Sequence, residues 1–248
     1  MRLSVNLNKI ALLRNARGNN YPSVEDFAYE ALSLGVHGLT LHPRQDSRHA
    51  TCNDAIELSS ICKKNSLEFN LEGNPFSLPK DDFIGFYELC DITKPEQITL
   101  VPDSIDQITS DCGWSPNYKE NKLKNFLTKI KHLDSRISLF INPEIESVEF
   151  AANLGLDRIE IYTGPFANSI QSTNIKEIKT TISLIITRAR ELGLGVNAGH
   201  DLNLQNLPHL IDCGEIDEVS IGHAIIIDAL KYGFHDTIIK YINTITTN

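Results

Sequence analysis

The stretch that decides the fold is Gly38-Leu39-Thr40-Leu41-His42-Pro43-Arg44, a short apolar run that ends in residues able to move protons or grip anions. Three further stretches follow the same plan, residues 69–73, 195–200 and 219–223, and they carry Glu72, His200 and His223 at their ends. A parallel barrel places its active site at the C-terminal ends of its strands, so we expect these endings to converge in space. The pattern indicates an enzyme.

Four more runs fit the same plan and bring the strand candidates to eight, namely residues 5–8, 98–101, 139–142 and 159–162. Between the runs lie segments with helical periodicity, at residues 24–34, 53–64, 119–132, 145–154, 175–192, 224–232 and 235–245. The spacing from strand to strand is about 30 residues, the length of a βαβ unit. Alternating strands and helices predict a parallel sheet flanked by helices.

Eight such units favour a closed (β/α)8 TIM barrel with extra helices over an open doubly wound sheet. An open sheet of the Rossmann type usually carries GxGxxG after its first strand, and the sequence has no such motif there. The length of 248 residues matches the roughly 250 typical of one barrel. No linker rich in Pro, Gly or Ser interrupts the chain, so we expect one domain spanning residues 1–248.

Composition excludes several classes of partner. The formal net charge is -9, which argues against nucleic acid or an acidic membrane as a partner, because both need clustered positive charge. The five cysteines contain no CxxC pair, so neither a disulfide framework nor a zinc site is expected, and a reducing cytoplasm is the better inference. No run approaches the roughly 18 apolar residues of a membrane helix, and Met1 leads directly into the first strand, leaving no room for a signal peptide.

Two loops are long enough to suggest function. Residues 15–22 follow the first strand region and include Arg17, and residues 102–117 follow the fourth strand and include Thr109 and Trp114. A loop of roughly 15 residues without regular structure is typical of an active-site lid. The alternative for the second loop is a tolerated insertion.

The residues that are candidates for proton transfer lie at the ends of individual predicted strands. His42 stands at a predicted catalytic rim, where a histidine is a natural general acid or base. Arg44, Arg48 and His49 follow it and suit a phosphate or carboxylate, since arginine offers paired N–H donors. Glu72 ends an apolar strand, where burial should raise its pKa toward values useful for a general base.

The later strands add a second group of candidates. Glu160 and Tyr162 point the same way from the sixth strand, and a buried carboxylate at Glu160 needs partners, so we expect it to face the rim. His200 and His223 each follow a glycine, and glycine lets backbone N–H groups approach a ligand closely. Gly222 precedes a predicted helix whose N-terminus would attract an anion.

A metal site is the alternative for His42, His49, Glu72 and His200. These residues lack HxH or HExxH spacing, and the nearby arginines would repel a divalent cation, so no metal is expected.

Put together, these segments resemble the pyridoxine 5′-phosphate synthase family of vitamin B6 biosynthesis. The matching stretches run in order along almost the whole chain: VNLNKIALLRNARG (5–18), LTLHPRQDSRH (39–49), FNLEGNP (69–75), ITLVPD (98–103), ISLFINP (137–143), RIEIYTGPFA (158–167), VNAGHDLN (196–203) and VSIGHAII (219–226). The resemblance implies a (β/α)8 barrel that condenses 3-amino-2-oxopropyl phosphate with 1-deoxy-D-xylulose 5-phosphate. The products are pyridoxine 5′-phosphate, phosphate and water, formed without metal or organic cofactor.

The resemblance also implies roles for individual residues. His42 and Glu72 would accept protons, His200 would donate one, and Glu160 would stabilise charge in the transition state. Two sets of residues would bind substrate: Asn6, Arg17, Gly222 and His223 the amino-ketone phosphate, and Arg44, His49 and Thr109 the deoxyxylulose phosphate. Members of the family assemble as octamers built from dimers, so a homo-octamer is expected by resemblance.

The chain departs from the family pattern at a few positions. Asn8-Lys9 stands where better-known members carry Asp-His, Asp201 where they carry Gly, and Tyr162 where a His often occurs. Asn8 and Lys9 can still bind the sugar phosphate, with the lysine as a point charge. Asp201 would place a negative charge beside a phosphate, so only its backbone is expected to help.

Two rival functions stay open at this point. One is an aldolase of the same fold that uses Lys9, the one lysine expected at the rim, as a Schiff base. The other is a barrel that senses phosphosugars without catalysis, for which the proposed proton-transfer residues would serve no purpose.

Overall fold

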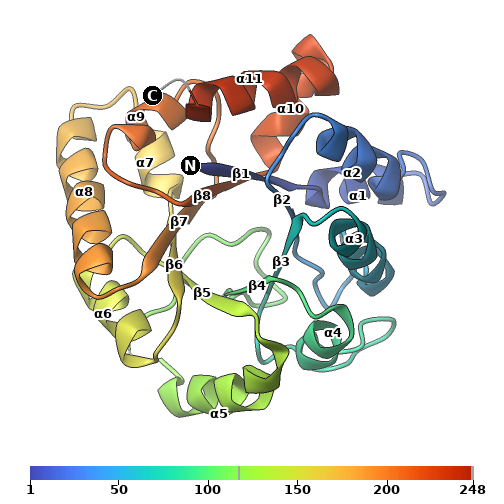
Figure 1. Cartoon of the computed structure of the whole chain (residues 1–248), viewed down its shortest axis with the longest axis horizontal. Helices are drawn as coiled ribbons and strands as arrows, with labels where there is room; N and C mark the ends of the chain where they lie inside the picture. Colours follow the sequence, from blue (N-terminus) through green and yellow to red (C-terminus); the bar gives the residue numbers. More distant parts are fainter. Residues whose placement is uncertain (117, 247–248) are drawn as a thin grey trace.

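The computed structural model describes residues 1–116 and 118–246, and in them eight parallel strands close into a barrel in sequence order (Figure 1). The strands are β1 (Arg2–Asn6), β2 (Gly38–Leu41), β3 (Glu68–Gly73), β4 (Gln97–Leu100), β5 (Arg136–Ile141), β6 (Arg158–Tyr162), β7 (Gly195–Gly199) and β8 (Glu218–Ile221). The barrel closes because β1 pairs with both β2 and β8.

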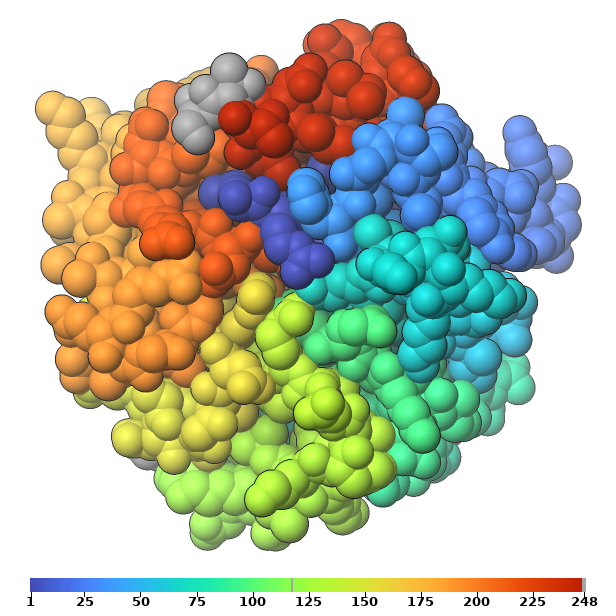
Figure 2. Space-filling view, viewed as in Figure 1, coloured from blue at the N-terminus to red at the C-terminus, as the bar shows by residue number. Residues whose placement is uncertain are grey.

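Helices form a ring outside the strands (Figure 1). They are α1 (Asn8–Asn15), α2 (Val24–Ser33), α3 (Cys52–Lys64), α4 (Phe86–Thr93), α5 (Glu120–Ile130), the 3-10 turn η1 (Lys131–Leu133), α6 (Ile145–Asn153), α7 (Gly164–Ser169), α8 (Ile175–Glu191), α9 (Leu207–Ile211), α10 (His223–Tyr232) and α11 (Phe234–Thr246). The predicted (β/α)8 barrel with extra helices is confirmed. In Figure 2 the segments follow one another around the molecule in sequence order, so that the blue N-terminal part adjoins the red C-terminal part.

Several boundaries differ from the prediction. The run 5–8 was expected to be strand, but β1 ends at Asn6 and Asn8 begins α1, because the Asn6 side chain turns back to accept the Asn8 N–H at 3.0 Å. The helix expected from Asn53 is capped by Thr51, whose hydroxyl and the Asp54 carboxylate satisfy each other's backbone N–H groups in a capping box. Helices α1, α4, α7 and α9 were not predicted, and each of them is only five to eight residues long.

Alternation along the strands separates an apolar outer face from a polar lumen. Leu3, Val5, Leu39 and Leu41 are fully buried, whereas their neighbours Ser4 and Thr40 share a 2.7 Å hydrogen bond. A barrel lumen is usually filled by bulky branched residues, so this polar filling is unusual.

The polar filling continues to the N-terminal end of the barrel. Gln97 Nε2 donates to Glu218 Oε1 at 3.4 Å, which joins β4 to β8, and since these strands are not neighbours the side chains meet inside the lumen. Arg2 and Arg136 each pair with Glu68 at 2.6 Å. Polar side chains therefore hydrogen-bond to one another in the layer below the rim. The candidate site residues are expected at the rim itself.

The β4–α5 loop is tied to the barrel at its C-terminal part. The predicted loop 102–117 is free of regular structure over residues 102–116, apart from a bridge between Trp114 and Ile141, and Asn117 lies outside the described residues. Trp114 is fully buried, and its indole N–H donates to the Leu100 carbonyl at 3.0 Å. The Gly113 N–H donates to Asn142 Oδ1 at 2.8 Å. The loop thus returns to the barrel between β4 and β5.

No helix in the described part of the chain is long and apolar enough to cross a membrane.

The close approach at Gly113 generates a first prediction. A Cβ there would lie 2.2 Å from the Asn142 nitrogen, so Gly113→Ala must displace backbone. We expect a loss of about 1–3 kcal/mol in the free energy of unfolding. For a chain of this size that lowers Tm by about 2–4 °C per kcal/mol. Thermal unfolding followed by circular dichroism measures it, and an unchanged Tm would show that the loop contact is not required.

Candidate active site

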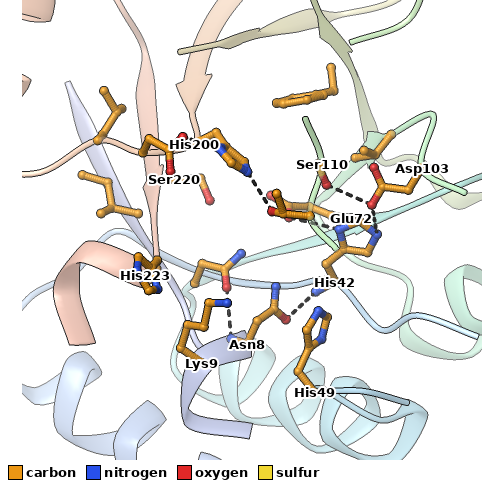
Figure 3. A pocket seen from close by; sticks show the side chains of 18 of the residues that line it. Asn8, Lys9, His42, His49, Glu72, Asp103, Ser110, His200, Ser220 and His223 are labelled. Atoms are coloured by element: carbon orange, nitrogen blue, oxygen red, sulfur yellow. Dashed lines mark hydrogen bonds and ion pairs between the residues drawn. The ribbon is translucent and has the colours of Figure 1, made fainter. Parts of the chain in front are cut away.

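A cavity of about 360 Å³ opens at the C-terminal ends of the strands (Figure 3). It is lined by the predicted site residues Asn6, Asn8, Lys9, His42, Arg44, His49, Glu72, Thr109, Glu160, His200, Asp201, Gly222 and His223. These residues come from strand ends and loops far apart in the sequence. The expected convergence at one rim is therefore found.

Arg17 is the predicted site residue that the structure does not bring to the cavity. It lies exposed in the turn after α1, where its N–H donates to the Arg14 carbonyl at 3.2 Å. Arg14 itself pairs with Asp54 of α3, with Nη2 2.9 Å from Oδ2. Arg14 thus forms a structural ion pair, and Arg17 lies in an exposed turn.

His42 lies at the centre of the site, buried between two carboxylates. Its Nδ1 is 3.9 Å from Glu72 Oε2, and its Nε2 is 3.5 Å from Asp103 Oδ2. Burial, together with the positive charges of Arg44 and Arg48, lowers the pKa of His42 to about 3. The imidazole is therefore neutral at neutral pH and free to accept a proton.

The two buried glutamates have raised pKa values. Burial raises the pKa of Glu72 well above its ordinary value, and the nearby Glu160 and Asp103 carboxylates add to the rise. Burial raises the pKa of Glu160 to about 7. Glu160 Oε2 has no hydrogen-bond partner among the described residues, and a Cβ at Gly199 would lie 2.2 Å from Glu160 Oε1. Glu160 is thus poised to exchange protons near neutral pH, and Glu72 holds its proton more tightly than an exposed carboxyl does.

His200 joins the β4–α5 loop to the end of β7. Thr109 Oγ1 and His200 Nε2 are hydrogen-bonded at 2.9 Å, and His200 Nδ1 lies 3.0 Å from Asp201 Oδ2. The Tyr162 ring meets the imidazole edge-on, with centroids 5.3 Å apart. The imidazole is therefore held in one orientation, and the loop reaches over the cavity at Thr109.

Groups suited to an anion gather on another side of the cavity, where Figure 3 shows Lys9, His49 and His223. Gly222 caps α10, and its own position leaves no room for a side chain because a Cβ would lie 2.9 Å from Asn6 Cβ. A helix N-terminus presents N–H groups that favour negative charge. Among the described residues, no group of three or more His, Cys, Asp or Glu side chains is placed to hold a metal ion.

Arg44 was predicted to grip a phosphate, and in the structure its guanidinium is bound to the β4–α5 loop. Nη1 donates to the Gln107 carbonyl at 2.9 Å and Nη2 to the Ser104 carbonyl at 2.6 Å. Nη2 also lies 3.4 Å from Asp103 Oδ2. The side chain faces the cavity while holding the loop.

Sequence reasoning missed Asp103, which lines the cavity and contacts His42. Ser110 Oγ donates to Asp103 Oδ2 at 2.9 Å, so the same carboxylate also touches the loop. Burial raises the pKa of Asp103. A signal was present, since an acidic residue follows the fourth strand just as Glu72 closes the third.

Comparison of the sequence with known proteins shows the family to which the chain belongs. The chain matches the family described as "Pyridoxal phosphate biosynthesis protein PdxJ" over residues 3–247. A relative from Xanthomonas axonopodis pv. citri, named pyridoxine 5′-phosphate synthase, is 43% identical over 242 residues, which cover 97% of this chain and 95% of the relative. A relative of the same name from Xylella fastidiosa strain M23 is 43% identical over 247 residues, covering 98% and 94%.

Solved structures resemble the chain in fold at much lower identity. Thiamine phosphate pyrophosphorylase from Pyrococcus furiosus has a TM-score of 0.62 at 12% identity, covering 98% of this chain and 94% of that one. Tryptophan synthase from M. tuberculosis, in its aminoacrylate-bound form, has a TM-score of 0.64 at 7% identity, covering 98% and 92%. At these identities the likeness shows the barrel fold alone.

The raised pKa of Glu160 generates a second prediction. A carboxyl with a folded pKa of about 7, against an ordinary 4.5, favours the folded state below pH 4.5 and loses that contribution as the pH rises through 7. At about 1.4 kcal/mol per unit, the loss is about 3 kcal/mol at most. We therefore expect Glu160→Gln to be more stable than the wild type at pH 8.

Urea unfolding at pH 8 and at pH 5 measures this difference, and the acidic condition serves as the internal control because the two proteins should unfold alike there. Equal stability of both proteins at both pH values would contradict the raised pKa.

Proposed function

This chain belongs to the family of pyridoxal phosphate biosynthesis protein PdxJ, and from this membership we infer that it is an enzyme that forms pyridoxine 5′-phosphate. The resemblance found in the sequence is thereby confirmed. We propose that the substrates are 3-amino-2-oxopropyl phosphate and 1-deoxy-D-xylulose 5-phosphate, and that phosphate and water leave with the product.

The observation that carries this proposal is the gathering of His42, Glu72, Glu160 and His200 around one cavity that also holds anion-binding groups. An amine must meet a ketone, so imine formation, dehydration and ring closure need several proton transfers near neutral pH. General acids and bases that surround two bound phosphates supply them, and holding both substrates in register contributes further to the rate.

We assign the early proton transfers to His42 and Glu72. The lowered pKa of His42 keeps its imidazole neutral, so that a ring nitrogen is available to accept a proton. Glu72 lies 3.9 Å from the His42 Nδ1, and its raised pKa lets the carboxyl take up a proton and release it again. The two groups can thus act in succession on one substrate.

We assign proton donation to His200 and charge stabilisation to Glu160. His200 is oriented by Asp201 and by Thr109. Since Thr109 belongs to the β4–α5 loop, this loop acts as a lid in our proposal, and its closure keeps water from reactive intermediates. Glu160 lies beside Gly199, and its Oε2, which has no hydrogen-bond partner in the described part of the chain, can face developing positive charge.

We divide the phosphate contacts as the resemblance suggests. Asn6, Gly222 and His223 would hold the amino-ketone phosphate at the start of α10. Arg44, His49 and Thr109 would hold the sugar phosphate, with Asn8 and Lys9 beside them in the same cavity. Asp201 would contribute through its backbone, and the phosphate contact of Arg17 stays a prediction because this residue lies away from the cavity.

We further propose a cytoplasmic homo-oligomer, an octamer by family resemblance. All five cysteines are free thiols, which fits a reducing compartment. Leu230 on α10 is 79% exposed, and the exposed Ile227 lies one turn before it on the same helix face, an apolar pair suited to contact with another subunit.

Turnover of the purified protein with both phosphate substrates and no added metal tests the function. We expect pyridoxine 5′-phosphate, followed by absorbance and mass, and a fall in kcat of about 10²–10⁴-fold in Glu72→Gln because a general acid–base group is lost. Glu57→Gln, an exposed change of the same kind on α3, is the matched control and should leave turnover unchanged.

Absence of product from well-folded wild-type protein would overturn the assigned substrates, and attention would then turn to Asn8, Lys9 and Asp201. Equal loss in the Glu72 and Glu57 variants would instead remove the chemical role assigned to Glu72.

A further inference from the structure

Two arginines of the β2–α3 connection hold the same part of the β4–α5 loop. Arg48 Nη1 donates to the Gln107 carbonyl at 2.7 Å and to the Ile108 carbonyl at 3.1 Å, and its Nη2 donates to the Ile105 carbonyl at 2.7 Å. The Gln107 carbonyl is shared, because it also accepts from Arg44 Nη1 at 2.9 Å. Residues 104–108 are here called the tied segment. Two neighbouring cations therefore bind four of its carbonyls, those of Ser104, Ile105, Gln107 and Ile108.

The two arginines are held differently. Arg48 is gripped by Asp46, with Nε 2.8 Å and Nη2 2.6 Å from Oδ2. Its side chain is 26% exposed and does not line the cavity, whereas the Arg44 side chain is 7% exposed and does. Arg48 is thus fixed outside the cavity by a two-point ion pair, whereas Arg44 reaches into the cavity with a single, longer ionic contact of 3.4 Å to Asp103.

Arg44 cannot keep all of its hydrogen bonds to the loop carbonyls if its guanidinium also binds the substrate phosphate. Charge-assisted contacts to a phosphate are stronger than those to a neutral carbonyl, so an anion in the cavity would draw its guanidinium from the Ser104 and Gln107 carbonyls. A loop tied by Arg44 alone would then be released at the moment when the site must close. The contacts of Arg48 avoid this outcome.

We propose that Arg48, fixed by Asp46, is a positioning residue that keeps the tied segment over the cavity while Arg44 exchanges loop carbonyls for an anionic substrate group. Thr109 follows the tied segment directly and contacts His200 Nε2, so Arg48 acts on the reaction through the placement of Thr109. The inference rests on the proposed function for the identity of the anion, but the exchange itself needs only a phosphate group.

Hydrogen–deuterium exchange of peptides covering residues 103–113, with and without inorganic phosphate, tests the proposal. In the wild type we expect similar protection in both conditions. In Arg48→Met we expect protection without phosphate and an exchange rate at least about tenfold higher with it, because neither arginine then holds the carbonyls of the tied segment. In Arg44→Met phosphate should have no effect, since Arg48 still holds the loop. Arg188→Met on the exposed face of α8 is the matched control and should behave as the wild type.

Kinetics supply a readout that general loosening would not give. In Arg48→Met we expect kcat to fall about tenfold or more at saturating sugar phosphate, with a smaller effect at low concentration, and partial recovery in Arg48→Lys, which keeps the charge but not the forked contacts. Phosphate-independent exchange in Arg48→Met, whether fast or slow, would overturn the division of roles. Failure of the wild type to form product would overturn the proposed function, while the exchange experiment would still decide the role of Arg48.

Discussion

The cost of burying the Glu72 and Glu160 carboxyls in one closed barrel is the constraint on which the site depends. Within residues 1–116 and 118–246 neither carboxyl pairs with a lysine or arginine, so burial raises the pKa of both and brings that of Glu160 to about 7. A usual barrel would surround such groups with branched apolar side chains. Here hydroxyls and amides fill the layer below, as in the 2.9 Å bond from Thr99 Oγ1 to Asn70 Oδ1. The lumen thus surrounds the polar groups at the rim with hydrogen-bonding side chains rather than with opposite charges.

The sequence predicts most of the rim because strand alternation and parallel topology determine where strand ends meet. His42, Glu72, Glu160 and His200 could be found in this way, each at the end of a β-branched or apolar run. What alternation does not determine is the path of a connecting loop. The contact of Asp103 with His42, the loop carbonyls on Arg44, and the exposed position of Arg17 all depend on such paths. The start of α1 at Asn8 was missed for a related reason, since one side-chain turn at Asn6 ends the strand.

Fold and function rest on different observations in this chain. Barrels with TM-scores of 0.62 and 0.64 carry other names at 12% and 7% identity, so the fold alone would leave the reaction open. The family membership comes from 43% identity over nearly the whole chain. The cavity connects the two, because it places the groups that the family reaction requires on the scaffold that many enzymes share.

The anchoring of Trp114 also gives the protein an optical probe of its own. The chain contains a single tryptophan, so its intrinsic fluorescence reports from one place. That indole is sealed at the base of the β4–α5 loop, with its ring 5.9 Å from Phe76 and 6.0 Å from Tyr118. A loop motion with its hinge before Trp114 would leave the emission spectrum unchanged. A motion that lifts the base of the loop would expose the indole to water and shift the emission to longer wavelength. The position of the hinge can thus be read in solution without a label.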